Sequence, residues 1–440
     1  GVRYRLEPAD ARAIVSLLRS GKLRQGMRAL APRRRTAHAV FSVRDPGPMI
    51  LPAHRLLAKL PGPRRRPTGG PQPPLPAPPA GGQDEHSSVQ WLRGEAALES
   101  IVPAWRAISD DPFTSPEWLL SWWHAFGAGR ALLAAALWRG EKLAALAVLT
   151  SDGDRLLTPT NEHTPHYDIA AIDEAARAQI LRALLHSRYR AVVLDALPDT
   201  SRTTAWLRAH TAGRHLASRR RHVSPFVDTS VSKDAFRAVS QPRWKAPLDR
   251  YRRKMERENG ASFHLLQAPE NLDRLLDAGF AIEASGWKGE AGTAIISDPA
   301  TNSFYRSLAH QYAATGELAV SWLSFGDEMV AFDLAFVVGG RVYGVKSGFD
   351  ERHRRLAPGL VLRLAIIERG IELGLATHEL LGDDADWKRK FASGDRAHTE
   401  LRLYRRGPAG TASWVYWAAT RPALQSAYLA LRRRRPSDHV

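Results

Sequence analysis

"YGVKSGFDERHRRLAPGLVL", residues 343–362, joins a strand-like segment, a basic turn and the start of an apolar run. The basic residues are Arg352–Arg355, and Pro358 and Gly359 follow after two intervening residues. Proline fits the first turn of a helix, where its missing N–H costs nothing, so a helix is expected to begin at Pro358. The first N–H groups of a helix lack intrahelical partners and lie at the positive end of its dipole. The stretch therefore predicts an anion site at a strand-to-helix turn.

Three residues would complete this anion site. Arg354 and Arg355 can give charge-assisted, bidentate contacts to phosphate oxygens, and Gly359 would let an anion approach the backbone. The helix that follows, residues 358–373, is mostly apolar and is therefore expected to be buried, which would hold the turn rigidly. The alternative interpretation is that the arginines only solvate a loop.

A β-rich region precedes the turn. Its three segments are residues 317–323, 329–337 and 341–347. They are separated by Phe325-Gly326-Asp327 and by Gly339-Gly340, and short turns of this kind join antiparallel neighbours. The sequence therefore predicts a three-stranded antiparallel meander, then the basic turn, the helix and a further strand at 377–381.

Helices and strands also alternate through the rest of the chain from Trp91 onward. Further helices are predicted at 118–126, 175–186, 234–260, 268–283 and 303–314. Further strands are predicted at 131–138, 142–150, 191–197 and 262–266. This alternation is typical of an α/β protein.

Basic residues are concentrated at the two ends of the 440-residue chain. The formal charge is +18, of which residues 1–83 carry +13 and residues 401–440 carry +7, while residues 84–400 carry −2. The body is electrically balanced, so nucleic acid is not an expected partner of the core. The chain has no cysteine, which excludes disulfides, a thiol nucleophile and Cys-ligated zinc.

The domain organisation follows from composition. Residues 61–79 contain nine prolines and read as an extended linker. No apolar run is long enough to span a membrane and no signal peptide is visible, so a soluble, cytoplasmic protein is expected. The predicted parts are a basic arm (1–60), a Pro-rich linker (61–90), an N-terminal half (91–230), a C-terminal half (231–406) and a basic helical tail (407–440).

The order of meander, basic turn, helix and strand resembles the GNAT acyltransferase superfamily, whose pyrophosphate loop reads Gln/Arg-x-x-Gly-x-Gly/Ala. Residues 354–359 fit this pattern, with Ala357 where the family has glycine. Four segments are also similar to the CelD-like acetyltransferases of cellulose biosynthesis, relatives of the Fem-type transferases. These segments are "IEASGWKGEAGTAI" (282–295), "FYRSLAHQYAATGEL" (304–318), "YGVKSGFDERHRRLAPGLVL" (343–362) and "DDADWKRKFA" (383–392). The resemblance covers roughly residues 100–406 and is stronger in the second half.

The resemblance implies an α/β (α+β) fold with two tandem GNAT-like halves, each a mostly antiparallel mixed sheet flanked by helices, behind a disordered basic arm. It implies acetyl-CoA or another acyl-CoA as co-substrate, no metal, and an amine or hydroxyl of a sugar, polysaccharide precursor or related small molecule as acceptor. The thioester would lie along two splayed strands. The pyrophosphate would lie on Arg354, Arg355, Leu356, Ala357, Pro358 and Gly359.

Acyl transfer of this kind needs a base for the ammonium and an acid for the departing thiolate. Glu283, or the pair Asp383 and Asp384, are the candidate bases; a helix-end carboxylate and a solvated loop are their structural alternatives. Tyr343 is the phenol nearest the expected thiolate, with core packing as its alternative. The candidates for binding substrate are Trp287, Lys288, Lys346, Trp387 and Lys388. The family has tyrosine where Trp387 stands, so a phenolic acid is absent from that position.

Two further signals receive less weight. His163-x-x-His166 has no third metal ligand nearby, which favours a loop role. The basic residues of 243–257 are interleaved with acidic ones, which favours a solvated helix face. Two other functions stay open: Fem-type aminoacyl-tRNA-dependent transfer, for which the basic helix would hold the nucleic acid, and a catalytically silent GNAT-fold partner in polysaccharide assembly.

Overall fold

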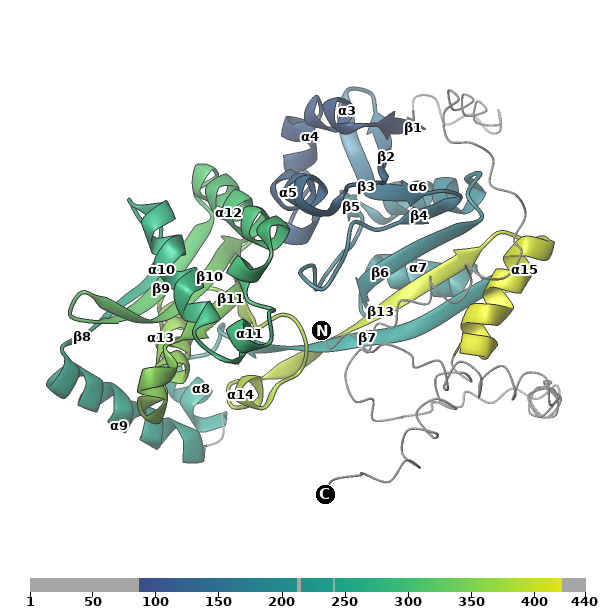
Figure 1. Cartoon of the computed structure of the whole chain (residues 1–440). Helices are drawn as coiled ribbons and strands as arrows, with labels where there is room; N and C mark the ends of the chain where they lie inside the picture. The colour runs from purple at the N-terminus through teal and green to yellow at the C-terminus, as the bar shows by residue number, and fades with distance from the viewer. Residues whose placement is uncertain (1–86, 212–214, 240–241, 422–440) are drawn as a thin grey trace, which may run out of the picture. The chain divides into compact units, whose positions relative to one another are not determined.

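A single mixed sheet runs through the described part of the protein (Figure 1). The computed structural model describes residues 87–211, 215–239 and 242–421; the expected basic arm, most of the linker and the end of the tail lie outside these ranges. The strands, in spatial order, are β1 (Ser87–Arg93), β2 (Ala131–Arg139), β3 (Lys142–Asp152), β4 (Arg155–Leu157), β6 (Ala191–Pro198), β13 (Gly394–Tyr404), β7 (His215–Asp228), β12 (Thr377–Glu379), β11 (Arg341–Phe349), β10 (Glu328–Val338), β9 (Leu318–Phe325) and β8 (Ala261–Gln267), with β5 (Ala170–Ala171) on β3.

The two ends of the sheet follow the same path. β1 to β4 are antiparallel neighbours, and β6 pairs parallel with β4 after helix α6 (Glu174–His186). β8 to β11 are likewise antiparallel, and β12 pairs parallel with β11 after helix α13 (Pro358–Glu372). The chain therefore contains two tandem halves of one topology, which confirms the predicted fold class.

The halves exchange their last strands at the centre of the sheet. β7 ends the first half but pairs with β12 of the second, whereas β13 ends the second half but pairs with β6 of the first. β7 and β13 also pair with each other and run side by side between the two halves in Figure 1. The basic run of β7 made this strand hard to predict from the sequence. In the structure Arg219 pairs with Glu400 of the adjacent strand β13, and Arg221 pairs with Asp195 of β6, the next strand beyond it.

Local sequence explains where the main helices begin. Ser115 caps α5 (Pro116–Phe126) and Asp298 caps α12 (Pro299–Ala314), each by accepting a backbone N–H from the first turn. The remaining helices are α3 (Glu95–Glu99), α4 (Val102–Arg106), α7 (Arg202–His210), α8 (Lys233–Val239), α9 (Pro242–Asn259), α10 (Leu272–Ala284), α11 (Trp287–Glu290), α14 (Asp386–Arg389) and α15 (Pro408–Val415), with short turns at Pro112–Thr114, Ile295–Ser297, Glu351–Leu356 and Tyr416–Thr420. Within the described ranges no helix is long and apolar enough to cross a membrane.

Helices cover both faces of the second half. α10 and α12 pack on one face of β9–β11, and α13 packs on the other face beside α9. The first face continues into the N-terminal half, because α5 lies on α12 and the Tyr312 hydroxyl bonds Ser115 at 2.8 Å. Trp118, Phe304 and Phe336 from both halves share this core. The two halves therefore share one hydrophobic core on this face of the sheet.

Candidate active site

The basic turn adopts a backbone conformation that glycine would favour. Residues Glu351–Leu356 form a short 3₁₀ turn, and Ala357 follows with φ +50° and ψ +49°, in the left-handed region. For an L-residue other than glycine this conformation costs roughly 1–2 kcal/mol. Pro358 is the first residue of α13, as predicted. Ala357 therefore holds the turn in a left-handed conformation at the cost of backbone strain that glycine would not carry.

The arginines of the turn fall into two groups. Arg352 pairs with Asp350 and Glu328. Arg354 and Arg355 are exposed, and within the described ranges neither has a carboxylate partner. Arg354 lines the cavity described below, whereas Arg355 does not. Of the two predicted phosphate ligands, the structure thus brings only Arg354 to the cavity.

The first turn of α13 offers fewer free donors than the sequence suggests. The N–H groups of Leu360 and Val361 both bond the Ala357 carbonyl, at 3.0 and 3.1 Å, and among the described residues the Gly359 N–H has no acceptor. A methyl group at Gly359 would lie 3.1 Å from the Phe349 ring. Close packing against β11 is therefore a reason for glycine here, in addition to the expected approach of an anion.

A cavity of about 660 Å³ opens where β11 and β12 separate. The parallel pairing of the two strands ends at Tyr343 and Glu379. Beyond these residues the cavity is lined by 344–349 on one side and 380–383 on the other. It extends from Arg354 at the start of α13 to Glu283 on α10. The predicted turn and the first candidate base therefore share one cavity.

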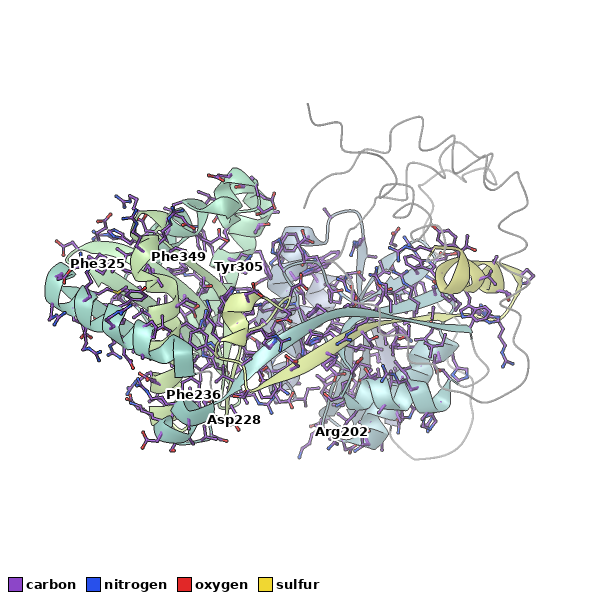
Figure 2. The ribbon with its side chains drawn as sticks, turned by 90° about the horizontal axis from the view of Figure 1, so that it is seen from below. Arg202, Asp228, Phe236, Tyr305, Phe325 and Phe349 are labelled. Carbon is purple, nitrogen blue, oxygen red and sulfur yellow. The ribbon has the colours of Figure 1, made fainter. Side chains whose placement is uncertain are left out.

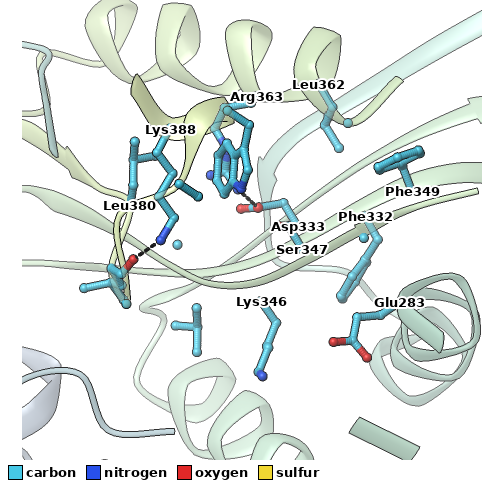
Figure 3. Close-up of a pocket in the computed structure, with 18 of the residues that line it drawn as sticks. Glu283, Phe332, Asp333, Lys346, Ser347, Phe349, Leu362, Arg363, Leu380 and Lys388 are labelled. Carbon is cyan, nitrogen blue, oxygen red and sulfur yellow. Dashed lines mark hydrogen bonds and ion pairs between the residues drawn. The ribbon is translucent and has the colours of Figure 1, made fainter. Parts of the chain in front are cut away.

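One face of the sheet brings together Glu283, Lys346 and Tyr305. Gly348 lies against the backbone of Glu283, which is buried and accepts the Ile295 N–H at 2.9 Å. The Lys346 ammonium lies 4.8 Å from the centre of the Tyr305 ring. Figure 3 shows Glu283 and Lys346 on the opposite side of the strands from the α13 residue Arg363. This side of the cavity is thus charged and walled by α10 and α12.

The N-terminal half supplies a histidine to this cavity. His163, in the loop before β5, bonds Tyr305 and Thr301 of α12 and stacks on Phe126 of α5. In Figure 2, Tyr305 lies on the side of the second half that faces the first. Burial, with the charge of Lys346, lowers the pKa of His163 to about 4, so the imidazole is neutral at pH 7.

The other histidine of the motif, His166, lies away from the cavity lining and 3.6 Å from Asp111. Within the described ranges no cluster of three or more ligating side chains could hold a metal. His163 does lie in a loop, as predicted, but sequence inspection missed its place in the cavity wall.

The opposite face carries a buried ion pair. Arg363 of α13 donates to Asp333 of β10 and to Nε2 of His378, the latter at 2.8 Å. Both members of the pair line the cavity, and Asp333 Oδ1 is buried without a hydrogen-bond partner in the described structure. Burial outweighs the effect of Arg363 and raises the pKa of Asp333 to about 6. A single charged residue in each of two apolar runs is the sequence signal that could have revealed this pair.

The remaining predicted residues are divided between cavity and core. Asp383 lines the cavity, but Asp384 pairs with Arg389 instead. Tyr343 packs 5.8 Å from the Phe113 ring, outside the cavity lining, as the core alternative expected. Burial raises the pKa of its phenol.

Of the residues predicted to bind substrate, the two on α14 lie at the cavity. Trp387 and Lys388 line the cavity, and the Lys388 ammonium donates to the Leu381 and Asp383 carbonyls, which holds the loop after β12. The loop residues Leu356 and Pro358 are absent from the cavity lining in the described structure. The side chains of Trp287 and Lys288 fall outside the described part.

Residues 243–389 match the family described as acetyltransferase (GNAT) domain. These residues form a GNAT domain. The GNAT domain contains β8–β12, the turn of Arg354 and most of the cavity lining, whereas β13 and the N-terminal half lie outside the match. No curated protein is significantly similar to the chain.

Several solved structures are similar to this chain over 70–77% of its length. FemX is 11% identical, with 77% of this chain and 100% of FemX covered and a TM-score of 0.47. L-PGS from Bacillus licheniformis is 14% identical, with 70% and 96% covered and a TM-score of 0.44. A tandem GNAT protein from the clavulanic acid biosynthesis pathway is 10% identical, with 73% and 100% covered and a TM-score of 0.38.

Proposed function

We propose that this protein is an acyl-CoA-dependent acyltransferase that transfers an acetyl group to an amine or hydroxyl of a sugar or polysaccharide precursor. The observation that carries the proposal is one continuous cavity. It runs from Arg354, which has no carboxylate partner among the described residues, through the gap between β11 and β12, to the buried Glu283. The acceptor class comes from the resemblance to the CelD-like acetyltransferases.

The donor would occupy the side of the cavity nearest α13. Its pyrophosphate would meet the Arg354 guanidinium and the Gly359 N–H at the positive end of the helix dipole. Its thioester arm would lie along residues 344–348 of β11, whose edge is no longer paired with β12. Backbone N–H groups along that edge would polarise the thioester carbonyl.

Glu283 is the base in this proposal. Its carboxylate lines the cavity on the α10 side, where an acceptor would approach the thioester from the face opposite α13. Asp383 also lines the cavity and is the second choice, whereas Asp384 is paired with Arg389 and is not proposed. Tyr343 is likewise left out, because its side chain packs in the core. Glu283 would take the first proton from the acceptor ammonium before attack.

Calorimetric titration of acetyl-CoA and of free CoA into the full chain tests the donor. Arg354→Ala should weaken micromolar binding about tenfold or more, a loss of about 1.4 kcal/mol. Arg352→Ala is the matched control, because Arg352 is exposed in the same turn but is neutralised by Asp350 and Glu328. Its affinity should stay within about twofold of the wild type.

Absence of CoA binding in the intact protein would refute the proposal. In that case, tRNA binding that weakens steeply with salt would favour the aminoacyl-tRNA alternative. On the basic helix α9, Arg252 and Lys254 are paired with Glu256 and Glu258, which leaves less free charge for nucleic acid than the sequence suggests. CoA binding without turnover on any acceptor would favour the silent GNAT-fold partner.

A further inference from the structure

Four polar side chains connect the cavity with the outer end of α12. The Tyr305 hydroxyl lies 3.2 Å from Nδ1 of His163, and Nε2 of His163 lies 3.2 Å from Oγ1 of Thr301. Oγ1 of Thr301 lies 2.7 Å from Oδ2 of Asp298. Tyr305 lines the cavity. The side chains of Tyr305 and Thr301 are both buried, whereas Asp298 is exposed. The connected groups therefore lead from the cavity wall to solvent.

The direction of each hydrogen bond follows from the carboxylate at the outer end. Bonds from the Thr301 hydroxyl and backbone N–H lower the pKa of Asp298, so its ionised carboxylate accepts the Thr301 proton. The Thr301 hydroxyl has one proton, so it accepts from Nε2–H of His163. A neutral imidazole protonated at Nε2 has a bare Nδ1, which accepts from the Tyr305 O–H. Every proton in the series thus points away from the cavity.

We propose that Tyr305, His163, Thr301 and Asp298 form a proton relay that removes a proton from the acceptor during acyl transfer. The inference rests on the proposed function. After Glu283 has taken the first proton of the ammonium, attack of the amine on the thioester carbonyl leaves a second N–H proton to be lost. That N–H bond breaks toward the Tyr305 oxygen, and the carbon–sulfur bond breaks with its electron pair on the departing thiolate.

The remaining proton shifts balance this step. Tyr305 gives its own proton to Nδ1 of His163, His163 gives its Nε2 proton to Thr301, and Thr301 gives its proton to Asp298. Asp298 is exposed and returns the proton to water. The His163 side chain is 13% exposed, so its two nitrogens can exchange protons with solvent and restore the first tautomer. No phenolate or imidazolium has to accumulate.

The surroundings of His163 suit a neutral relay. The charged groups that act on it are Lys346 of β11, Glu283 of α10, Asp298 of α12 and its neighbour Glu162. Lys346 disfavours an imidazolium and the carboxylates favour one, while burial is the largest influence and disfavours it. The ring is held between Phe126 and the edge of Tyr305, which fixes its two nitrogens toward their partners.

Nuclear magnetic resonance of the full chain with ¹⁵N-labelled histidine tests the hydrogen-bond chain without any substrate. Signals of His163 are identified by their loss in His163→Gln. The expected result is the Nε2–H tautomer, neutral down to about pH 4, with an Nδ1 shift that changes in Tyr305→Phe and does not change in Ser307→Ala. Ser307 is the matched control. It lies on the same helix, α12, but its hydroxyl bonds Ser121 of α5 and takes no part in the series of hydrogen bonds from Tyr305 to Asp298. The Nδ1–H tautomer, or titration near pH 6.5, would overturn the proposal.

Thiol release from acetyl-CoA, with glucosamine as the probe acceptor, tests the transfer. Thr301→Val keeps the side-chain shape, removes the hydroxyl and does not alter the cavity lining. Its kcat should fall about tenfold or more, with KM for acetyl-CoA within about twofold, and Thr301→Ser should restore the rate. A wild-type kcat in Thr301→Val would overturn the relay. Absence of acetyl-CoA binding would instead contradict the proposed function, and the resonance experiment would still decide the hydrogen-bond chain.

Discussion

Gly348 sets the distance between β11 and α10, so Gly348→Ala is a direct test of the cavity's geometry. A methyl group at this position would lie 2.7 Å from Cα and 3.0 Å from the backbone nitrogen of Glu283. Non-bonded carbon atoms are normally about 3.5–4.0 Å apart, so strand and helix must separate by about 1 Å. Backbone atoms cannot rotate away as a side chain can. Overpacking of this kind costs about 1–3 kcal/mol.

Gly370→Ala provides the opposite case on the other face of the sheet. Gly370 is a buried residue of α13, and the nearest neighbour of an added methyl group would be a Thr229 methyl carbon at 3.8 Å, an ordinary contact. Alanine in a helix with room for its methyl group stabilises a protein by about 0.4–1 kcal/mol. The added group is the same in both variants, but only at Gly348 does it meet backbone atoms, so opposite signs are expected for the two changes in stability.

Urea unfolding followed by tryptophan fluorescence measures both variants. The midpoint for Gly348→Ala should fall, and that for Gly370→Ala should rise or stay level. Acyl transfer should also fall in Gly348→Ala, because Glu283 moves with α10. A Gly348→Ala protein as stable as the wild type, or a destabilised Gly370→Ala protein, would refute the reasoning.

Three further predictions concern stability at low pH, the strained turn and the base. The rings of His222 and His398 stack with their centres 4.5 Å apart, and burial lowers their pKa values to about 4 and about 2. Between pH 6.5 and 4 these histidines are protonated in the unfolded chain but neutral in the folded protein, so the free energy of unfolding decreases as the pH falls. His222→Gln should flatten this decline by up to about 1.4 kcal/mol per pH unit, and equal slopes in urea unfolding at pH 7, 6 and 5 would contradict it. Ala357→Gly should change stability by less than about 0.5 kcal/mol, because relief of the left-handed strain offsets the added chain entropy, whereas Ala357→Val should lose about 1–3 kcal/mol in thermal unfolding. Glu283→Gln should lower acyl transfer about 100-fold or more and Asp384→Asn should keep it within about threefold; equal rates would remove Glu283 as the base.

Local signals in the sequence were sufficient for most of the C-terminal half. The meander of β9, β10 and β11, the start of α13 at Pro358 and the strand β12 follow from alternation, turn residues and helix-start residues, which act over a few positions. The same signals predicted the position of the basic turn. They gave no prediction for β7 or β13, because the arginines of β7 are neutralised by carboxylates that are distant in sequence.

The sequence alone determined the meander and the helix that follows it in the C-terminal half, the uneven distribution of charge and the basic turn before α13. Only the tertiary structure decided which polar groups meet. In the tertiary structure Arg354 lines the cavity and Arg355 does not, and Tyr343 packs in the core. His163 of the first half lies against Tyr305 of the second. The physical reason is that side chains meet through strand exchange and helix packing between segments more than a hundred residues apart, and no local pattern encodes such contacts.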